Sequence, residues 1–205
     1  MTKKKLPAKA DSDIAERVGR AILEFAGRIP KSRARKSRAP LAVARNAANK
    51  AAAKAALAAG SLALPPGPIG WMTVLPEMVG VWRIQAQLVA DIARIYGKSG
   101  SLTREQMLYC LFRHSAAQAV RDLVVRAGER FLVRQASIRM IQSITRKIGV
   151  RVTHRSIGSA VSRWLPLAGA VGVGAYAYYD TVQVASTAMH LFEAEIVVSR
   201  DREKT

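Results

Sequence analysis

The sequence contains few cysteines and few aromatic residues, and each shortage excludes a class of protein. Its 205 residues include one cysteine, so neither an internal disulfide nor a cysteine-based zinc site can form. Aromatic residues make up 6%, too few for a row of base-stacking platforms along a single nucleic-acid strand. The first 30 residues also lack the apolar core of a secretory signal. We therefore expect a reducing, cytoplasmic environment.

The motifs of common enzyme classes are missing as well. Nothing matches G-x-S-x-G, H-E-x-x-H or a Walker A motif, and the glycines of residues 169–174 are spaced G-x-x-G-x-G instead of G-x-G-x-x-G. Cys110 and His114 have the i, i+4 spacing of two metal ligands on a helix, but the other two histidines lie far away in sequence. A buried thiol beside a partly exposed histidine is the simpler interpretation. We expect no cofactor, no metal and no enzymatic activity.

Acidic residues are scarce relative to basic ones. The chain has 33 Lys and Arg against 14 Asp and Glu, which gives a formal net charge of +19. Residues 1–60 alone hold 15 basic and 4 acidic groups, a net charge of +11. A charge of this size predicts an anionic partner, either a membrane surface or a nucleic acid.

The charge is densest between Pro30 and Pro40 and just before them. Six cations fall within eleven residues there, and we take them as the contacts with an anionic surface: Arg28, Lys31, Arg33, Arg35, Lys36 and Arg38. So many like charges, interrupted by prolines, predict an exposed basic linker. A short amphipathic helix over residues 14–25 precedes it.

Helical periodicity dominates the rest of the chain and predicts an all-α helical bundle. Thr103 and Gln106 form a capping-box pattern at the start of a long helix, and Gly97 ends the helix before it. A further helix is expected to start near Gly128 and to carry Arg126, Arg130 and Arg134 on one face. The expected helices span residues 14–25, 40–60, 76–96, 103–124 and 138–149, followed by a glycine-rich helix in residues 163–192, and no strand of useful length is expected.

The first of two long apolar segments covers residues 57–82. It carries one ionisable group, Glu77, over 26 residues, which is the length of a membrane span. Pro65, Pro66 and Gly67 argue against a continuous helix, because each interior proline costs about 3 kcal/mol. The segment therefore predicts a helix end and a tight apolar turn, with a new helix beginning at Pro76. The turn is either buried or re-entrant.

The second apolar segment, residues 163–192, contains Asp180 as its only acidic residue. The cost of inserting that aspartate, about 3 kcal/mol, offsets the gain from the branched aliphatic residues, so a lone transmembrane helix is not favoured. Gly169, Gly172 and Gly174 instead suit close packing of helices. The composition thus divides the chain into a basic, partly disordered extension (1–56), a helical domain (57–199) and a charged tail (200–205).

Glu77 and Asp180 are candidates for buried ionisable groups, since a carboxylate in an apolar segment needs a partner. Arg83, Arg94 or Arg163 could supply it, which would make structural ion pairs. A role in proton transfer or ligand binding and simple exposure at a helix end remain as alternatives.

Three motifs in order resemble the bacterial EcsC family. They are the Pro-Pro-Gly apolar turn at residues 65–67, the helix that ends in Ile95, Tyr96 and Gly97, and the glycine-rich helix of residues 166–192. The resemblance covers about residues 57–192. It implies a helical, membrane-associated bacterial protein of unestablished biochemical activity, with an ABC-type transporter as a partner. It implies no catalytic residues, and the basic N-terminal region lies outside it.

These observations predict a non-enzymatic helical protein, accessory or regulatory, on the cytoplasmic face of a bacterial inner membrane. It would be peripheral or partly inserted, and held there by its basic and apolar segments. A basic nucleic-acid-binding protein is the alternative, because the same cations would neutralise phosphates. An enzyme acting on lipid is a third option, for which Glu77, Asp180 and His114 are the candidate groups.

Overall fold

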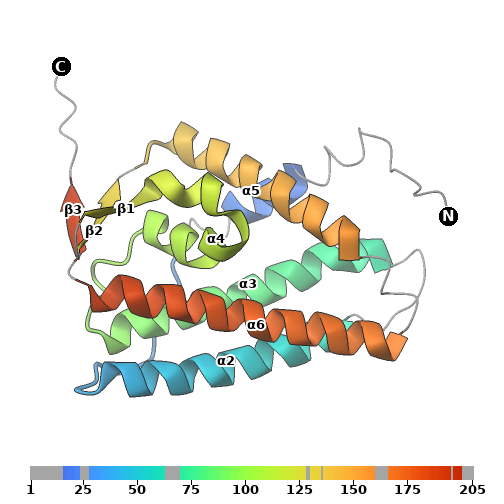
Figure 1. Cartoon of the computed structure of the whole chain (residues 1–205), viewed down its shortest axis with the longest axis horizontal. Helices are drawn as coiled ribbons and strands as arrows, with labels where there is room; N and C mark the ends of the chain where they lie inside the picture. The colour runs from blue at the N-terminus through green and yellow to red at the C-terminus, as the bar shows by residue number, and fades with distance from the viewer. Residues whose placement is uncertain are drawn as a thin grey trace.

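Most of the chain is helical, as its periodicity predicts. The computed structural model describes residues 16–23, 28–62, 70–127, 130–134, 136–159, 166–194 and 196–199. Residues 16–23 are helical, and the longer helices are α2 (Pro40–Leu62), α3 (Gly70–Ile95), α4 (Arg104–Val120), α5 (Ile138–Ser159) and α6 (Pro166–Glu193). In Figure 1, α6 runs in front with α2 beside it, α3 lies behind, and α4 and α5 lie on the opposite side from α2. The predominantly helical class is confirmed.

Local chemistry sets two of the helix ends as predicted. The Thr103 hydroxyl accepts a hydrogen bond from the Gln106 backbone N–H at 3.3 Å, and the Gln106 side chain accepts one from the Thr103 N–H at 2.8 Å. Gly97 has φ of +74° just after α3, and its N–H and that of Lys98 bond back to carbonyls of the last turn. A residue with a Cβ is strained in that backbone conformation.

The start of α3 differs from the prediction. The helix begins at Gly70, and Pro76 lies within it instead of opening it. Pro76 is the seventh residue of α3 and has no backbone N–H to donate to the carbonyl four residues before it. Pro65, Pro66 and Gly67 lie outside the described residues.

A small sheet replaces the helix that was expected near Gly128. After α4 and a short 3-10 helix, η1 (Arg121–Leu123), strand β1 (Val124–Ala127) pairs antiparallel with β2 (Arg130–Arg134), and β3 (Ile196–Ser199) pairs parallel with β2. Arg126, Arg130 and Arg134 therefore do not share a helix face. Valines and a phenylalanine on either side of Ala-Gly-Glu favour strands, and this signal outweighed the weaker helical spacing.

The main core lies where α4 crosses α3 and α6. Phe112 is buried in α4, and its ring meets that of Trp82 from α3 edge to face, with centroids 5.5 Å apart. Large apolar side chains fill this region: Ile92, Met107, Leu108, Leu111, Ile141, Ile148, Leu191 and Phe192. A second, smaller cluster of Ala55, Ala59 and Ala177 joins α2 to α6.

The predicted boundary at residue 57 falls inside α2. This helix continues from Pro40 to Leu62 and buries Ala44, Ala48 and Ala52 against the body of the molecule. Residues 40–56 therefore belong to the helical body and not to a separate extension. Among the described residues, no helix combines the length and the apolar composition that crossing a bilayer requires.

Candidate functional site

The basic segment, residues 28–39, is attached to α3 although it has no regular secondary structure. The Ser32 hydroxyl donates a hydrogen bond to Asp91 Oδ1 at 2.6 Å. The Gln87 amide donates to the same oxygen at 3.0 Å and to the Lys31 carbonyl at 3.4 Å. Two polar side chains of α3 thus hold the middle of the segment, which a linker free in solution would not show.

The end of the basic segment is anchored at the end of α3. The Ser37 N–H donates to the Ile95 carbonyl at 3.0 Å, which satisfies one of the carbonyls left open at the helix end. The Lys36 side chain crosses Gly97, and a Cβ there would lie 2.8 Å from Lys36 Cε. The absence of a side chain at Gly97 therefore lets the segment lie close to the α3 turn.

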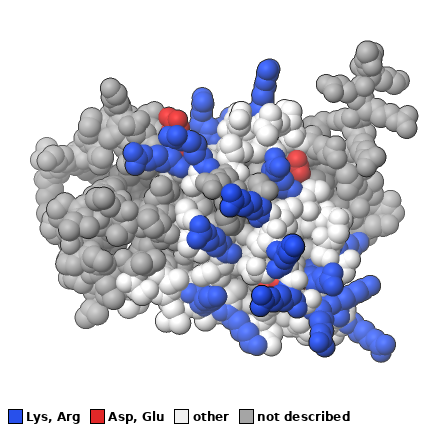
Figure 2. All heavy atoms as spheres, turned by 180° about the vertical axis from the view of Figure 1, so that it is seen from behind, with Lys and Arg blue, Asp and Glu red and all other residues white. Residues whose placement is uncertain are grey.

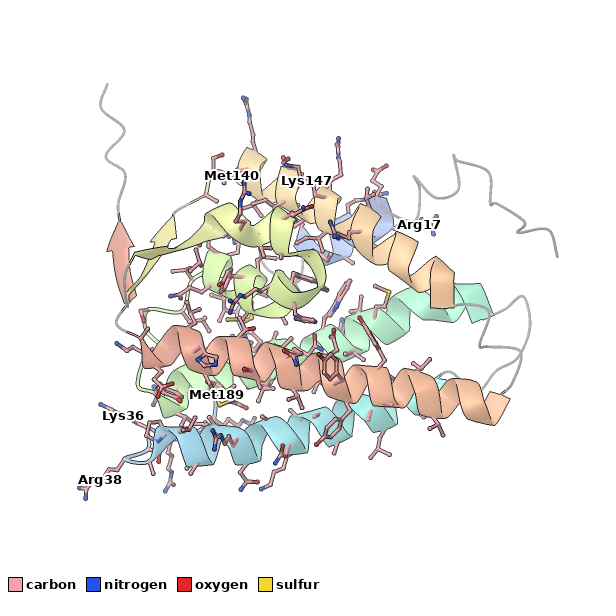
Figure 3. All side chains as sticks on the ribbon, viewed as in Figure 1. Arg17, Lys36, Arg38, Met140, Lys147 and Met189 are labelled. Atoms are coloured by element: carbon pink, nitrogen blue, oxygen red, sulfur yellow. The ribbon has the colours of Figure 1, made fainter. Side chains whose placement is uncertain are left out.

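The six predicted surface cations all lie on this attached segment, and all are exposed: Arg28, Lys31, Arg33, Arg35, Lys36 and Arg38. Figure 3 shows Lys36 and Arg38 pointing away from the helices beside the start of α2. Figure 2, which shows the face behind that of Figure 1, has basic side chains spread over its described part and few acidic ones. The structure thus presents the cations from an ordered backbone.

The described acidic side chains do little to neutralise this surface. Asp91, next to the segment, receives hydrogen bonds from a hydroxyl and an amide. Glu105 is buried and accepts from the Ala136 N–H at 3.2 Å. Asp180 also lies mostly inside. Glu16 pairs with Arg20 at 3.6 Å, away from the segment in sequence. Internal contacts thus occupy Asp91, Glu105 and Asp180, whereas Glu16 and Glu193 are exposed but far outnumbered by exposed cations, so the surface potential stays positive.

A polar cluster, comprising His114, Asp180, Gln85 and Thr181, joins three helices inside the molecule. His114 Nε2 from α4 and Asp180 Oδ1 from α6 are 2.5 Å apart, with side chains 18% and 15% exposed. The Gln85 amide of α3 donates to Asp180 Oδ2 at 2.7 Å and lies 3.2 Å from the Thr181 hydroxyl oxygen. Asp180 is therefore mostly, but not fully, buried, and its partners differ from those expected.

The prediction of an arginine partner for Asp180 is not met in the described contacts. Arg83 and Arg94 are exposed on α3, and Arg94 donates to the Ser99 hydroxyl. Arg163 lies outside the described residues. A histidine four residues after Cys110 supplies the partner instead, because α4 crosses α6 at this level. Sequence spacing alone could not reveal that crossing.

The polar cluster binds helices together and shows no arrangement for nucleophilic catalysis. The Thr181 hydroxyl donates to the Ala177 carbonyl at 2.7 Å, which occupies its proton. Gln85 Oε1 and His114 Nδ1 are buried without a hydrogen-bond partner among the described atoms. No group of three potential metal ligands occurs in the described part of the chain. Cys110 is fully buried as predicted, and burial raises the pKa of its thiol strongly, so it is a poor nucleophile.

The glycines of α6 differ in whether they pack closely against another helix. A Cβ at Gly174 would lie 3.1 Å from the Ala56 carbonyl oxygen, which confirms close packing there. Gly172 has no atom within 4 Å of that position, so its predicted packing role is wrong within this chain. Gly169 lies in α6 and Glu77 lies in α3. The burial of these two residues is outside what the structure describes, so their predicted roles stay predictions.

Sequence reasoning missed the contacts that hold the basic segment. Ser32, Gln87 and Asp91 are ordinary surface residue types, and nothing in their spacing predicts a contact 59 residues apart. Gln85 stands between the apolar residues Trp82 and Leu88 at helical spacing, and a glutamine in such a position is a signal that a polar partner lies opposite.

No family model, no curated protein and no solved structure matches this chain.

Proposed function

We propose that this protein binds an anionic surface, the cytoplasmic face of a bacterial membrane, in a non-enzymatic accessory or regulatory role. One observation carries the proposal. Six exposed cations are displayed by residues 28–38, which hydrogen bonds fix to α3, while neighbouring Asp91 is engaged by Ser32 and Gln87. A fixed backbone reduces the entropy that the segment would lose on binding.

The magnitudes support this proposal. Each Lys or Arg close to an anionic membrane surface contributes about 1 kcal/mol, so several of the six cations acting together suffice for peripheral binding. Such binding weakens as salt screens the charges. The resemblance to the EcsC family points the same way, since it implies a membrane-associated helical protein with an ABC-type transporter as a partner.

Sedimentation with vesicles tests the proposal. The full chain is expected to sediment with vesicles of phosphatidylglycerol and phosphatidylethanolamine, to be released by about 0.5 M salt, and to ignore phosphatidylcholine vesicles. Replacing Arg33, Arg35 and Arg38 by glutamine is expected to weaken binding by on the order of a hundredfold. These side chains are exposed, so the fold is retained.

A matched variant removes the same charge elsewhere. Replacing Arg139, Arg146 and Lys147, which are exposed on α5, by glutamine lowers the net charge equally and is expected to cost much less. Equal losses from the two triple variants would show that net charge alone attracts the protein. Binding to a random DNA duplex at salt that abolishes vesicle binding would replace this proposal with the nucleic-acid alternative.

A further inference from the structure

The outward side of α2 combines cations with an exposed leucine. Lys50, Lys54 and Leu57 are spaced i, i+4 and i+7, so they lie on one face of the helix. All three are exposed, and 76% of Leu57 is open to solvent. Helix α2 contains no acidic residue over its 23 positions. The face is therefore positive toward the start of the helix and apolar toward its end.

The first half of α6 has an exposed face of a different kind. Val171 is 72% exposed, and three of the chain's five tyrosines, Tyr176, Tyr178 and Tyr179, are 51%, 41% and 61% exposed. Val171, Ala175 and Tyr178 follow i, i+4, i+7 spacing, so they share one side of the helix. Asp180 turns inward to His114 and leaves this exposed face uncharged.

The two faces adjoin. Gly174 brings the α6 backbone against α2, where a Cβ would lie 3.1 Å from the Ala56 carbonyl oxygen and 4.0 Å from Gly60 Cα. Leu57 follows Ala56 directly, so its exposed side chain belongs to the same end of the helix pair. Figure 1 shows α2 and α6 running side by side over this length. The exposed apolar residues of α6 and Leu57 of α2 therefore lie on neighbouring helices, and Lys50 and Lys54 precede Leu57 on the same face of α2.

The basic segment leads into this surface. Residues 28–39 end where α2 begins, and Figure 3 places Lys36 and Arg38 beside the start of α2. Cations thus continue from the segment along α2 through Lys50 and Lys54 up to Leu57. The phosphate headgroups of a bilayer attract the cations. The interfacial layer just beneath them accepts leucine and valine, and also tyrosine, because its ring is apolar while its hydroxyl stays hydrated.

We propose that the paired outward faces of α2 and α6 rest in the headgroup layer of an anionic bilayer, with Leu57, Val171 and Tyr179 entering the interface and Lys50 and Lys54 meeting phosphates. Parallel contact of this kind requires no helix that crosses the membrane. The inference rests on the proposed function, and it names the side of the molecule that faces the lipid.

Single-cysteine probes test this orientation, because the native thiol of Cys110 is buried and stays unlabelled in the folded chain. The variants Leu57→Cys and Tyr179→Cys carry a nitrobenzoxadiazole dye. Ile138→Cys is the matched control, since Ile138 is apolar and 62% exposed on α5. With phosphatidylglycerol vesicles, the first two dyes are expected to shift to the blue and brighten at least about twofold, and the third to stay unchanged.

A double variant supplies an independent readout. Leu57→Ser with Tyr179→Ser is expected to lower vesicle partitioning about tenfold with the same salt dependence, whereas Ile138→Ser leaves partitioning unchanged. If the unmodified chain binds vesicles but the dyes at 57 and 179 respond no more than the dye at 138, this orientation is wrong while the proposed function stands. If the unmodified chain does not bind vesicles, both the orientation and the proposed function are wrong. If the dyes respond to rising protein concentration in the absence of lipid, this face binds a second copy of the chain and not a membrane.

Discussion

The two packing regions of this protein use side chains of opposite size. Around α4 the core is built from large residues, among them Phe112, Trp82 and Phe192. At the other region α2 meets α6 through Ala55, Ala59 and Ala177, with Gly174 against the backbone of α2. Large side chains gain stability by excluding water from a wide area, whereas small ones gain it by bringing backbones close.

This contrast has a consequence for the surface. The helix pair is held by alanine and glycine near Gly174, and several large residues of α2 and of the first half of α6 are exposed there. Leu57, Val171 and Tyr179 are 76%, 72% and 61% exposed. Exposed apolar residues grouped in this way are typical of a surface that contacts a partner or a membrane.

The largest effect is expected in the large-residue core. Phe112→Ala should lower the free energy of unfolding by about 3–5 kcal/mol, because it removes the ring and leaves a cavity beside Trp82. Chemical denaturation followed by circular dichroism measures it. Ile138→Ala, on the exposed side of α5, should change stability by less than about 0.5 kcal/mol. A similar loss in both variants would mean that α4 does not organise the core.

At the α2–α6 contact, stability should be lost when a side chain is added, because the two backbones already lie close together. Gly174→Val is expected to destabilise by about 1–3 kcal/mol, since its Cβ would press on the Ala56 carbonyl, which cannot rotate away. Gly172→Val is the matched change two residues earlier, where no atom lies within 4 Å. It should be neutral or slightly stabilising, and thermal melts of the two variants should diverge. Parallel melts would contradict the close approach of the two backbones.

The polar cluster between the two regions should show an intermediate effect. Asp180→Ala leaves the Gln85 amide and His114 Nε2 without their shared acceptor, at a cost of about 1–2 kcal/mol for a pair that water partly reaches. Asp180→Asn keeps one acceptor oxygen and should lose less. Denaturation midpoints of the two variants give the comparison. Midpoints of both variants equal to that of the unmodified chain would show that the carboxylate bonds contribute nothing to joining α3, α4 and α6.

The smallest expected effect is a loss of folding stability at alkaline pH. Burial raises the pKa of the Cys110 thiol above its ordinary value of 9.0, so the folded chain keeps this proton where the unfolded chain releases it. Stability is therefore full below pH 9.0 and falls as the pH rises above it, by up to about 1.4 kcal/mol per pH unit. Cys110→Ala should lack this part of the slope between pH 9 and 10. Identical slopes would mean that the thiol ionises equally in both states.

The fold class and several helix ends follow from the sequence for local reasons. The Thr103 capping box and the Gly97 turn involve residues within a few positions of each other, so their chemistry is complete in the sequence. The same locality explains two errors. The helical spacing of Arg126, Arg130 and Arg134 suggested a helix, but pairing of β2 with residues 65 positions later in the chain favours extended backbone. Gly172 and Gly174 differ by two positions, and only the direction of α2 decides which of them packs.

The sequence by itself determined the charge of the protein, its helical content and the position of its six clustered cations, because these depend on composition and near neighbours. The tertiary structure decided which groups meet. It brought Ser32 to Asp91 and turned a linker into a fixed basic surface, and it gave Asp180 a histidine where arginines were expected. It also set α2 beside α6 and left Leu57, Val171 and Tyr179 exposed. Contacts of this kind depend on how helices cross, which no spacing along a single helix encodes.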